Sequence, residues 1–199
     1  MIGSSKSLLI VLSGPSGVGK DAVISRMKEL GHPLHFIVTA TPRPKRAGER
    51  DGVDYLFLSE AKFQKMIEQG ELLEWAEVYG HHYGVPKDQV KQALAESKDV
   101  MIKVDIQGAA TIKRLLPQAV LIFLAPPSLE ELTERVKGRE TEASPDLKLR
   151  LETAKREMES LPLFDYVVVN QEIDQAVSQI KAIITAEKCR VNPRVVKLE

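Results

Sequence analysis

The sequence contains little cysteine and no excess of either charge. Its single cysteine, Cys189, cannot form a disulfide within the chain, which is typical of proteins from a reducing compartment. Lys and Arg together number 28, as do Asp and Glu, so the formal net charge is zero. A general surface for nucleic-acid polymers or anionic membranes needs a basic excess. We therefore expect neither partner, and any anion site has to be local.

Long hydrophobic runs are also missing. No apolar stretch approaches the roughly 20 residues of a membrane-spanning helix. The run at residues 8–12 is too short for a secretory signal. These absences predict a cytoplasmic protein. With 199 residues, 43% of them hydrophobic, the chain is long enough for one compact domain with inserted segments, and it allows a homo-oligomer.

Four short apolar runs predict β-strands. They are rich in aliphatic and β-branched residues and do not alternate with polar ones, as is typical of strands in a parallel sheet covered on both faces. Helical stretches separate them, and this alternation predicts a doubly wound α/β fold. The expected strands are residues 8–12, 100–104, 120–124 and 166–169, and the expected helices are about 22–30, 109–116, a helix capped by Ser128, 146–161 and 174–189.

Residues 36–97 interrupt this alternation and predict an inserted, mostly antiparallel substrate-binding subdomain. A polar segment at 138–145 predicts a small lid between two helices. Within the subdomain we expect a loop rich in proline and arginine at 41–52, a strand at 55–58, a helix after Ser59, and a strand pair at 72–78 and 83–85. The expected organisation is core 1–35, subdomain 36–97, core 98–127, lid region 128–150 and core 151–199.

Two features of the expected strand pair have simple interpretations. His81 and His82 are adjacent in a predicted turn, so their side chains point apart, and we expect exposed turn residues rather than metal ligands. Trp75 is expected to pack under the subdomain.

A phosphate-binding pattern, G-x-x-x-x-G-K, follows the first predicted strand directly. Glycines let the backbone curl so that successive N–H groups face phosphate oxygens, and the next helix adds the positive end of its dipole. Lys20 supplies a positive charge for the terminal phosphates. The pattern predicts an ATP-dependent kinase. The residues expected to hold the phosphates of ATP are Gly14, Pro15, Ser16, Gly17, Val18, Gly19 and Lys20.

The position after Lys20 departs from the pattern. A Ser or Thr hydroxyl there coordinates Mg²⁺, whereas this chain has Asp21 followed by Ala22. A carboxylate ligates Mg²⁺ readily, but an acid also suits the first turn of a helix. Two interpretations stay open: Asp21 is a metal ligand, or it caps the helix while water completes the metal shell.

Beyond the loop, several blocks of sequence follow one another in a recognisable order. They are Thr41-x-Arg43-x-x-Arg46-x-Gly48-Glu49, Asp51-Gly52-x-Asp54-Tyr55, Glu74-Trp75-Ala76, Tyr83-Gly84, Val104-Asp105-Ile106-Gln107-Gly108, Arg135-x-x-x-Arg139, Thr141-Glu142, Arg150-Leu151-x-x-Ala154 and Phe164-Asp165-Tyr166-Val167-Val168-Val169-Asn170. Over about residues 7–190 the chain resembles guanylate kinase, a P-loop nucleoside monophosphate kinase that transfers phosphate from ATP to GMP with Mg²⁺.

The resemblance implies a site for the GMP phosphate in the inserted subdomain. Arg43, Arg46 and Tyr55 would bind this phosphate, with Tyr83 as a further contact. A guanidinium fork matches two phosphate oxygens, which suits such a role. By composition alone, the same loop would be a solvated charged segment.

The resemblance also implies how guanine is read. Thr39 and Glu74 would contact the base, because a carboxylate accepts two N–H groups from the Watson–Crick edge of guanine and adenine lacks this pair. A site built on such groups rejects the wrong base strongly. Val85 stands where the family usually has Ser or Thr, so recognition should depend more on Glu74 and Thr39.

Asp105 closes the predicted strand 100–104 and has three open interpretations. P-loop enzymes often place a magnesium-side acid at such a strand end. In the family the corresponding residue also lies near the GMP base. The third option is an ordinary helix N-cap.

The resemblance assigns catalysis to Arg139 and Arg150, together with Lys20 and Arg46. A closing lid that carries arginines surrounds the moving phosphate with positive charge and excludes water. Asp146–Arg150 and Glu131–Arg135 could instead be ordinary i,i+4 pairs of exposed helices. Asn170 and Gln171 end the last predicted strand, where the family contacts adenine.

Two rival functions are weighed against an ATP:GMP phosphotransferase. Ribose 1,5-bisphosphate phosphokinase resembles guanylate kinase and shows Gly-Lys-Asp in its loop, but a phosphorylated sugar has no base edge for Glu74 to read. Guanylate-kinase-like domains of scaffolding proteins bind peptides and have lost ATP chemistry. Lys20 and the lid arginines Arg139 and Arg150 speak against that second alternative.

Overall fold

A five-stranded parallel sheet forms the core of the computed structural model, which describes residues 7–137, 152–153, 155–196 and 198. Its strand order is β2-β7-β1-β8-β9, and every neighbouring pair is parallel. Four strands coincide with the apolar runs of the sequence, whereas β2, a half-buried edge strand, is too short to give such a run. The strands are β1 (Leu9–Ser13), β2 (Leu34–Phe36), β7 (Asp99–Lys103), β8 (Val120–Ala125) and β9 (Tyr166–Val169).

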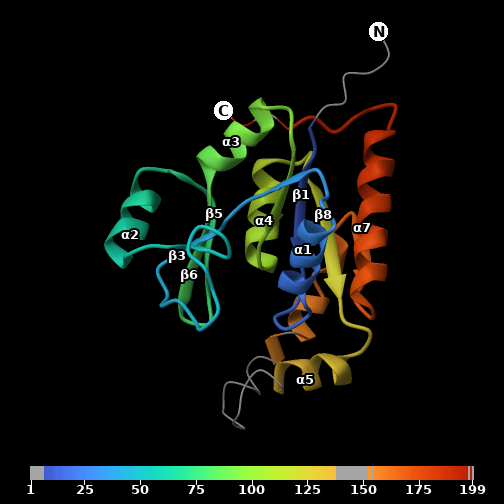
Figure 1. Cartoon of the computed structure of the whole chain (residues 1–199), viewed down its shortest axis with the longest axis horizontal. Coiled ribbons are helices and arrows are strands. Elements are labelled where there is room, and N and C mark those ends of the chain that lie inside the picture. Colours follow the sequence, from blue (N-terminus) through green and yellow to red (C-terminus); the bar gives the residue numbers. More distant parts are fainter. Residues whose placement is uncertain (1–6, 138–151, 154, 197, 199) are drawn as a thin grey trace.

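Helices cover both faces of this sheet, as the apolar runs predict. Along β1 the side chains alternate between the two faces. Ile10 and Leu12 pack toward α1 (Lys20–Glu29) and α7 (Ile173–Lys188). Leu9 and Val11 pack toward the opposite face, which is covered by α3 (Lys87–Ala95) and α4 (Ile106–Leu115) (Figure 1). The doubly wound α/β fold is therefore confirmed.

The helix ends follow local capping chemistry. The Ser128 hydroxyl accepts the Glu131 backbone N–H at 3.2 Å, which caps α5 (Leu129–Lys137) as predicted. Helix α4 begins three residues earlier than the pattern indicates, because Asp105 caps it by accepting the Gly108 N–H at 2.9 Å. Of the expected helix 146–161, residues 152–153 and 155–158 are helical, whereas residues 159–160 form a turn and a 3-10 helix begins at Leu161, so the helix ends earlier than expected.

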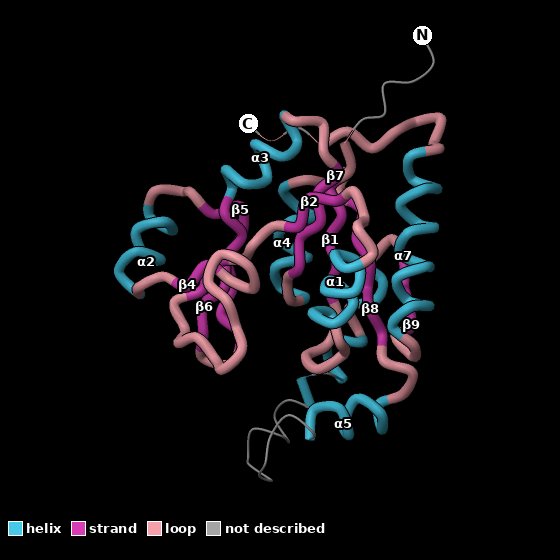
Figure 2. The backbone as a smooth tube through the Cα atoms, viewed as in Figure 1, coloured by secondary structure: helices cyan, strands magenta, loops and turns pink. Residues whose placement is uncertain are grey.

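A second, four-stranded sheet lies beside the core in the order β4-β3-β6-β5 (Figure 2). Two of its three strand pairs are antiparallel and one is parallel, so it is mostly antiparallel as expected. Its strand β5 packs against α4 of the core. The elements of this region are β3 (Ala40–Thr41), β4 (Leu56–Phe57), α2 (Glu60–Glu68), β5 (Leu72–Val78) and β6 (His81–Pro86).

The hairpin of β5 and β6 is tighter than expected, which corrects two side-chain predictions. Its turn consists of Tyr79 and Gly80, both at positive φ, as a two-residue hairpin loop requires. His81 and His82 consequently lie in β6 and not in the turn. Trp75 is 46% exposed instead of packing beneath the subdomain, because strand alternation turns it away from the face that carries Glu74.

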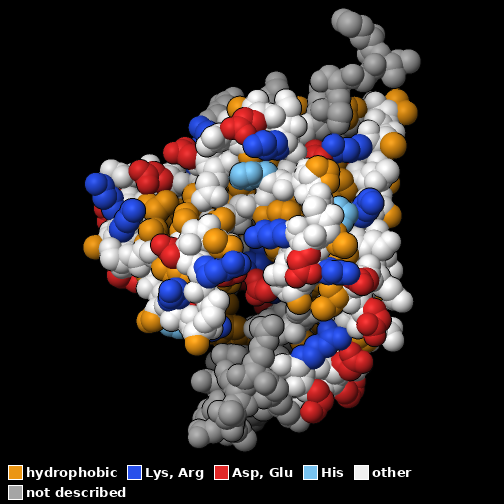
Figure 3. Space-filling model, in the orientation of Figure 1, with side chains coloured by type: hydrophobic (Ala, Val, Ile, Leu, Met, Phe, Trp, Pro, Cys, Tyr) orange, Lys and Arg blue, Asp and Glu red, His pale blue; other side chains and the backbone are white. Residues whose placement is uncertain are grey.

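Two further observations concern the surface. Cys189 follows α7 and is exposed. Basic and acidic side chains are interspersed over the face shown in Figure 3. Among the described residues, none of the helices combines the length and the apolar character needed to cross a bilayer.

Candidate active site

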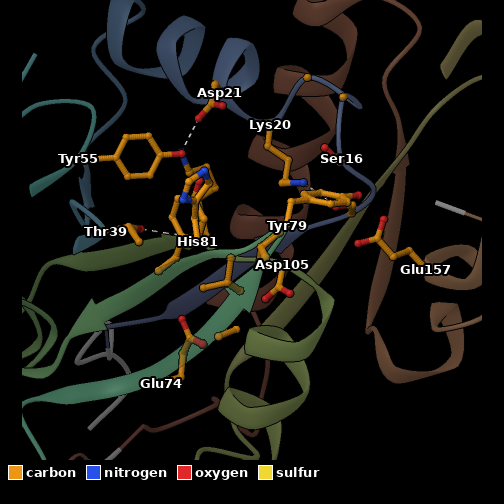
Figure 4. Close-up of a pocket in the computed structure, with 18 of the residues that line it drawn as sticks. Ser16, Lys20, Asp21, Thr39, Tyr55, Glu74, Tyr79, His81, Asp105 and Glu157 are labelled. Atoms are coloured by element: carbon orange, nitrogen blue, oxygen red, sulfur yellow. Dashed lines mark hydrogen bonds and ion pairs between the residues drawn. The ribbon is translucent and has the colours of Figure 1, made fainter. Parts of the chain in front are cut away.

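A cavity of about 740 Å³ lies where the phosphate loop, the end of β7 and the second sheet meet (Figure 4). Most of the residues that the sequence assigns to the site reach it from distant parts of the chain. Those that line it are Gly14, Ser16, Gly17, Gly19, Lys20, Asp21, Thr39, Arg46, Tyr55, Glu74, Tyr83 and Asp105. The cavity therefore joins the expected ATP and GMP sites in one space.

The phosphate loop is shaped by glycines that no other residue could replace without strain. Gly14, Gly17 and Gly19 all have positive φ. A Cβ on Gly14 would lie 2.2 Å from the Leu124 carbonyl oxygen, so the loop touches the backbone of β8. Gly19 is also the N-cap of α1, which places the start of that helix at the cavity.

Lys20 folds back over this loop. Its ammonium donates to the Gly14 carbonyl at 2.5 Å and to the Pro15 carbonyl at 3.0 Å. An ammonium has three donors, so one more is available to a phosphate. Burial lowers the pKa of Lys20, and the nearby carboxylate of Glu157 opposes that change.

Asn170 lies behind the loop. Its side-chain amide donates to the Val18 carbonyl at 2.7 Å, and Asn170 is only 3% exposed. A Cβ on Gly19 would lie 2.6 Å from the same amide nitrogen, so Asn170 supports the loop closely. Gln171 is exposed at the end of β9. An adenine contact by either residue stays a prediction.

Arg43 has a different environment from Arg46. Its side chain is 3% exposed and forms a two-pronged ion pair with Glu49, at 2.5 and 2.8 Å. Its Nε also donates to the Tyr83 hydroxyl at 3.1 Å, and its guanidinium lies 4.9 Å from the Tyr55 ring centroid. The hydrogen bonds to Glu49 raise the pKa of Arg43 above its usual range. In this structure Arg43 holds the two tyrosines, while Arg46 faces the cavity.

Glu74 is a buried carboxylate at the end of the cavity that lies away from the phosphate loop (Figure 4). It is 5% exposed, and its Oε2 has no hydrogen-bond partner among the described residues. Burial, assisted by the charge of Asp105, raises the pKa of Glu74 to about 8. A Cβ on Gly108 would lie 2.7 Å from Oε2, so a larger residue there would displace the Glu74 carboxylate. Such a group is suited to accept N–H donors from a bound base.

The neighbours of Glu74 agree with a base-binding pocket. Thr39 is 5% exposed, and its hydroxyl donates to the Lys103 carbonyl at 3.5 Å. Val85 pairs with Glu74 across the hairpin and is fully buried in the core. The valine side chain has no group that could hydrogen-bond a base, so the expected dependence on Glu74 and Thr39 stays a prediction.

The carboxylates assigned to a metal have protein partners. The N-cap interpretation of Asp105 is confirmed by its bond to Gly108, whereas its metal and base contacts stay predictions. The Asp21 carboxylate contacts the ammonium of Lys103, a partner that neither interpretation of Asp21 includes. The N-cap of α1 is Gly19, and Asp21 lies in the first turn of that helix. Within the described ranges, no group of three or more His, Cys, Asp or Glu residues is arranged to hold a metal ion.

Sequence reasoning missed several residues of the cavity, and two of them, Lys103 and Glu157, carry charge. Lys103 ends β7 with a side chain that is 16% exposed, and the only signal for it is a lysine within an apolar run. Glu157 points toward the cavity near the phosphate loop, and burial raises its pKa against the opposing effect of Lys20 (Figure 4). It lies in a stretch rich in charged residues, where nothing distinguishes it.

The predicted lid lies mostly outside the described residues. Arg139 and Arg150 both fall in that part of the chain, so their catalytic role stays a prediction. Arg135 is described and forms the expected i,i+4 pair with Glu131 at 3.1 Å. It also lies 3.5 Å from the Val18 carbonyl, which brings α5 to the phosphate loop.

A glycine-rich loop between the first strand of a parallel sheet and its helix, facing a cavity lined by a second sheet, defines a P-loop nucleotide-binding protein. The guanylate kinase family model matches residues 6–187. The chain therefore belongs to the guanylate kinase family, whose members are nucleoside monophosphate kinases.

Individual relatives agree with this assignment. A guanylate kinase of Caldanaerobacter subterraneus subsp. tengcongensis is 46% identical over 187 residues, which is 94% of this chain and 91% of the relative. Guanylate kinase 2, chloroplastic/mitochondrial, of Oryza sativa subsp. japonica is 48% identical over 96% of this chain and 68% of its own length. The crystal structure of guanylate kinase from Anaplasma phagocytophilum superimposes with a TM-score of 0.80, at 31% identity, over 94% of this chain and 89% of that one.

Proposed function

We propose that this chain transfers the γ-phosphate of ATP to GMP. The observation that carries the proposal is the buried Glu74 carboxylate, which shares one cavity with the phosphate loop. In the reaction, the bond between the γ-phosphorus and the bridging oxygen of ATP breaks, and its electron pair leaves with ADP. A new bond forms from a GMP phosphate oxygen to the same phosphorus, which gives GDP. No covalent intermediate on the protein is needed.

Base recognition falls to Glu74 and Thr39. The N–H groups of the guanine Watson–Crick edge would supply the hydrogen bonds that Oε2 lacks within the described chain. AMP offers one donor and one acceptor at that edge, so one oxygen of the buried carboxylate would face an acceptor and stay unpaired. A phosphorylated sugar would leave it unpaired as well, and this favours GMP over the ribose 1,5-bisphosphate alternative.

The second sheet and the phosphate loop, on the two sides of the cavity, would each position one phosphate group. Arg46, Tyr55 and Tyr83 would hold the GMP phosphate, with Arg43 as a direct contact or as the residue that fixes the tyrosines. The loop and Lys20 would hold the phosphates of ATP, while Asn170 and Gln171 would lie toward adenine. Alignment of the two phosphates and neutralisation of their charge supply the catalysis. Arg139 and Arg150 would add positive charge as the lid closes.

Mg²⁺ is proposed as the metal of this reaction. In phosphoryl-transfer sites Mg²⁺ is held by one or two carboxylates together with substrate phosphates and water, so three protein ligands are not required. Asp21 and Asp105 both line the cavity and would hold it. When bound, the ion would offset the charge that develops on the phosphate oxygens.

We further propose that the chain is divided into core, subdomain and lid as its sequence predicts. Residues 36–97 would form the GMP-binding subdomain and 128–150 the lid region, with 1–35, 98–127 and 151–199 as the core. A cytoplasmic role in purine nucleotide metabolism would follow from the reaction.

The direct test is a comparison of acceptors. With purified protein, ATP and Mg²⁺, GMP should be consumed at least a hundredfold faster than AMP, CMP or UMP, because only guanine satisfies Glu74. ADP release measured for each acceptor checks this. Absent turnover of GMP, or equal turnover of all four, would overturn the proposal.

The pH dependence of GMP binding gives a second prediction. Glu74, with a pKa of about 8 in the free protein, has to release its proton to accept two N–H groups. The KM for GMP should therefore fall as pH rises, by up to about tenfold per unit between roughly pH 6.5 and 8, and then level off. The KM for ATP over the same range serves as the control and should change little. A KM for GMP that is flat across this range would contradict the role of Glu74 as an ionised acceptor.

A further inference from the structure

Lys103 lies where the two halves of the cavity meet. It ends β7, next to the phosphate loop on one side and the second sheet on the other. Its ammonium contacts the Asp21 carboxylate in the first turn of α1 and donates to the Tyr55 hydroxyl at 3.0 Å. The same nitrogen lies 4.4 Å from the Tyr55 ring centroid. One side chain thus connects the helix of the phosphate loop with a residue expected to bind the GMP phosphate.

Lys103 is a largely buried lysine at the wall of the cavity. Its side chain is 16% exposed, whereas that of Asp21 is 62% exposed. Burial of an ammonium costs free energy, and the contacts with Asp21 and Tyr55 offset that cost. The same charge, held at the wall of the cavity, is also placed to attract an anionic ligand.

The surroundings of Lys103 are suited to an anion. Lys20 and Arg46 line the same cavity as Lys103, together with the acids Asp21, Glu74, Asp105 and Glu157. The three cations attract a bound polyanion. Two of the three ammonium donors are used by Asp21 and Tyr55, which leaves one for such a ligand.

We propose that Lys103 is a further substrate-binding residue, which contacts the phosphate of GMP, and that Asp21 is the residue that positions it. A phosphate oxygen that accepts from the Tyr55 hydroxyl would lie near the Lys103 nitrogen, because that nitrogen is 3.0 Å from the same hydroxyl. The inference rests on the proposed function, because it takes GMP as the ligand. It also assigns Asp21 a task besides the metal contact.

The test separates the phosphate from the base. GMP and guanosine are titrated calorimetrically into the wild-type chain and into the variants Lys103→Met and Lys103→Arg, without ATP. Lys103→Met should weaken GMP binding on the order of tenfold or more, as expected for the loss of a charge-assisted hydrogen bond. Guanosine, which has no phosphate, should bind both forms equally. Lys103→Arg should retain part of the GMP affinity. The matched control is Lys62→Met on the exposed side of α2, which removes the same charge away from the cavity.

Each other outcome has a defined meaning. Equal GMP affinity of wild type and Lys103→Met overturns the inference, and so does an equal loss for guanosine and GMP, which would indicate a structural role. Failure of the wild type to bind GMP overturns the proposed function instead.

The positioning role of Asp21 is tested with further variants in the same GMP titration. Asp21→Asn should weaken GMP binding in the wild-type chain but add nothing in the Lys103→Met background, because Asp21 acts through Lys103. Additive losses would show that Asp21 acts independently and would overturn that part of the proposal.

Discussion

Replacement of Lys20 by Met should lower kcat by about a hundredfold to a thousandfold while GMP still binds. The side chain bridges two loop carbonyls and reaches the place expected for the terminal phosphates of ATP. Its charge is needed most as the phosphoryl group moves, and removal of one such preorganised donor costs about a hundredfold to a thousandfold in other enzymes. Single-turnover measurements with saturating ATP check the effect on the chemical step.

The control for this variant is Lys181→Met, which removes an exposed ammonium from α7. That protein should behave like the wild type. Calorimetric titration with GMP shows whether the GMP site of the Lys20→Met variant is intact. Turnover within a factor of ten of the wild type would rule out the assigned role of Lys20.

Replacement of Glu74 by Gln should remove the preference for GMP over AMP. The amide keeps the shape of the carboxyl group but presents one donor and one acceptor, so it opposes one N–H of guanine and matches the edge of adenine. We expect the ratio of kcat/KM for GMP to that for AMP to fall about a thousandfold, as for other sites that lose a buried hydrogen-bonding pair. Glu77→Gln, on the same strand but with an exposed side chain, is the matched control. An unchanged ratio would show that another group reads the base.

The same variant should be more stable than the wild type at alkaline pH. A carboxyl whose pKa rises from 4.5 to about 8 on folding costs nothing below pH 4.5, where it is protonated in both states. Between those values the unfolded chain loses the proton and the folded chain keeps it, so stability falls as pH rises. The full cost above pH 8 is at most about 5 kcal/mol. Thermal unfolding of both proteins at pH 4 and pH 9 measures the difference, which should appear only at the higher pH.

Much of the fold could be predicted because its core strands are continuous apolar runs. Such a run at residues 120–124 leaves little choice but a buried strand, and β8 is indeed fully buried. The edge strand β2 has three half-buried residues and β3 has only two buried ones, so neither is long enough to give a comparable pattern. The tight turn at Tyr79 was also missed, because a tyrosine with positive φ is not expected from sequence.

The site residues also differ in how far the sequence predicts them. The phosphate loop is local in sequence, and glycine spacing defines it. Lys103 contacts Tyr55 and Asp21, which are 48 and 82 positions away in the sequence, so no local pattern predicts these contacts. Arg43 could be assigned to the phosphate from its motif, but its ion pair with Glu49 depends on how the loop closes, which only the structure describes.

Trp75, which turns its ring outward from β5, also makes the molecule easy to observe. It is the sole tryptophan of the chain, so the indole fluorescence has one origin. It is adjacent to Glu74 in sequence but points away from the cavity, and its ring lies 5.8 Å from that of His82. Its emission therefore reports on the β5–β6 hairpin from the face that points away from the cavity. No optical label has to be introduced where the nucleotides would bind.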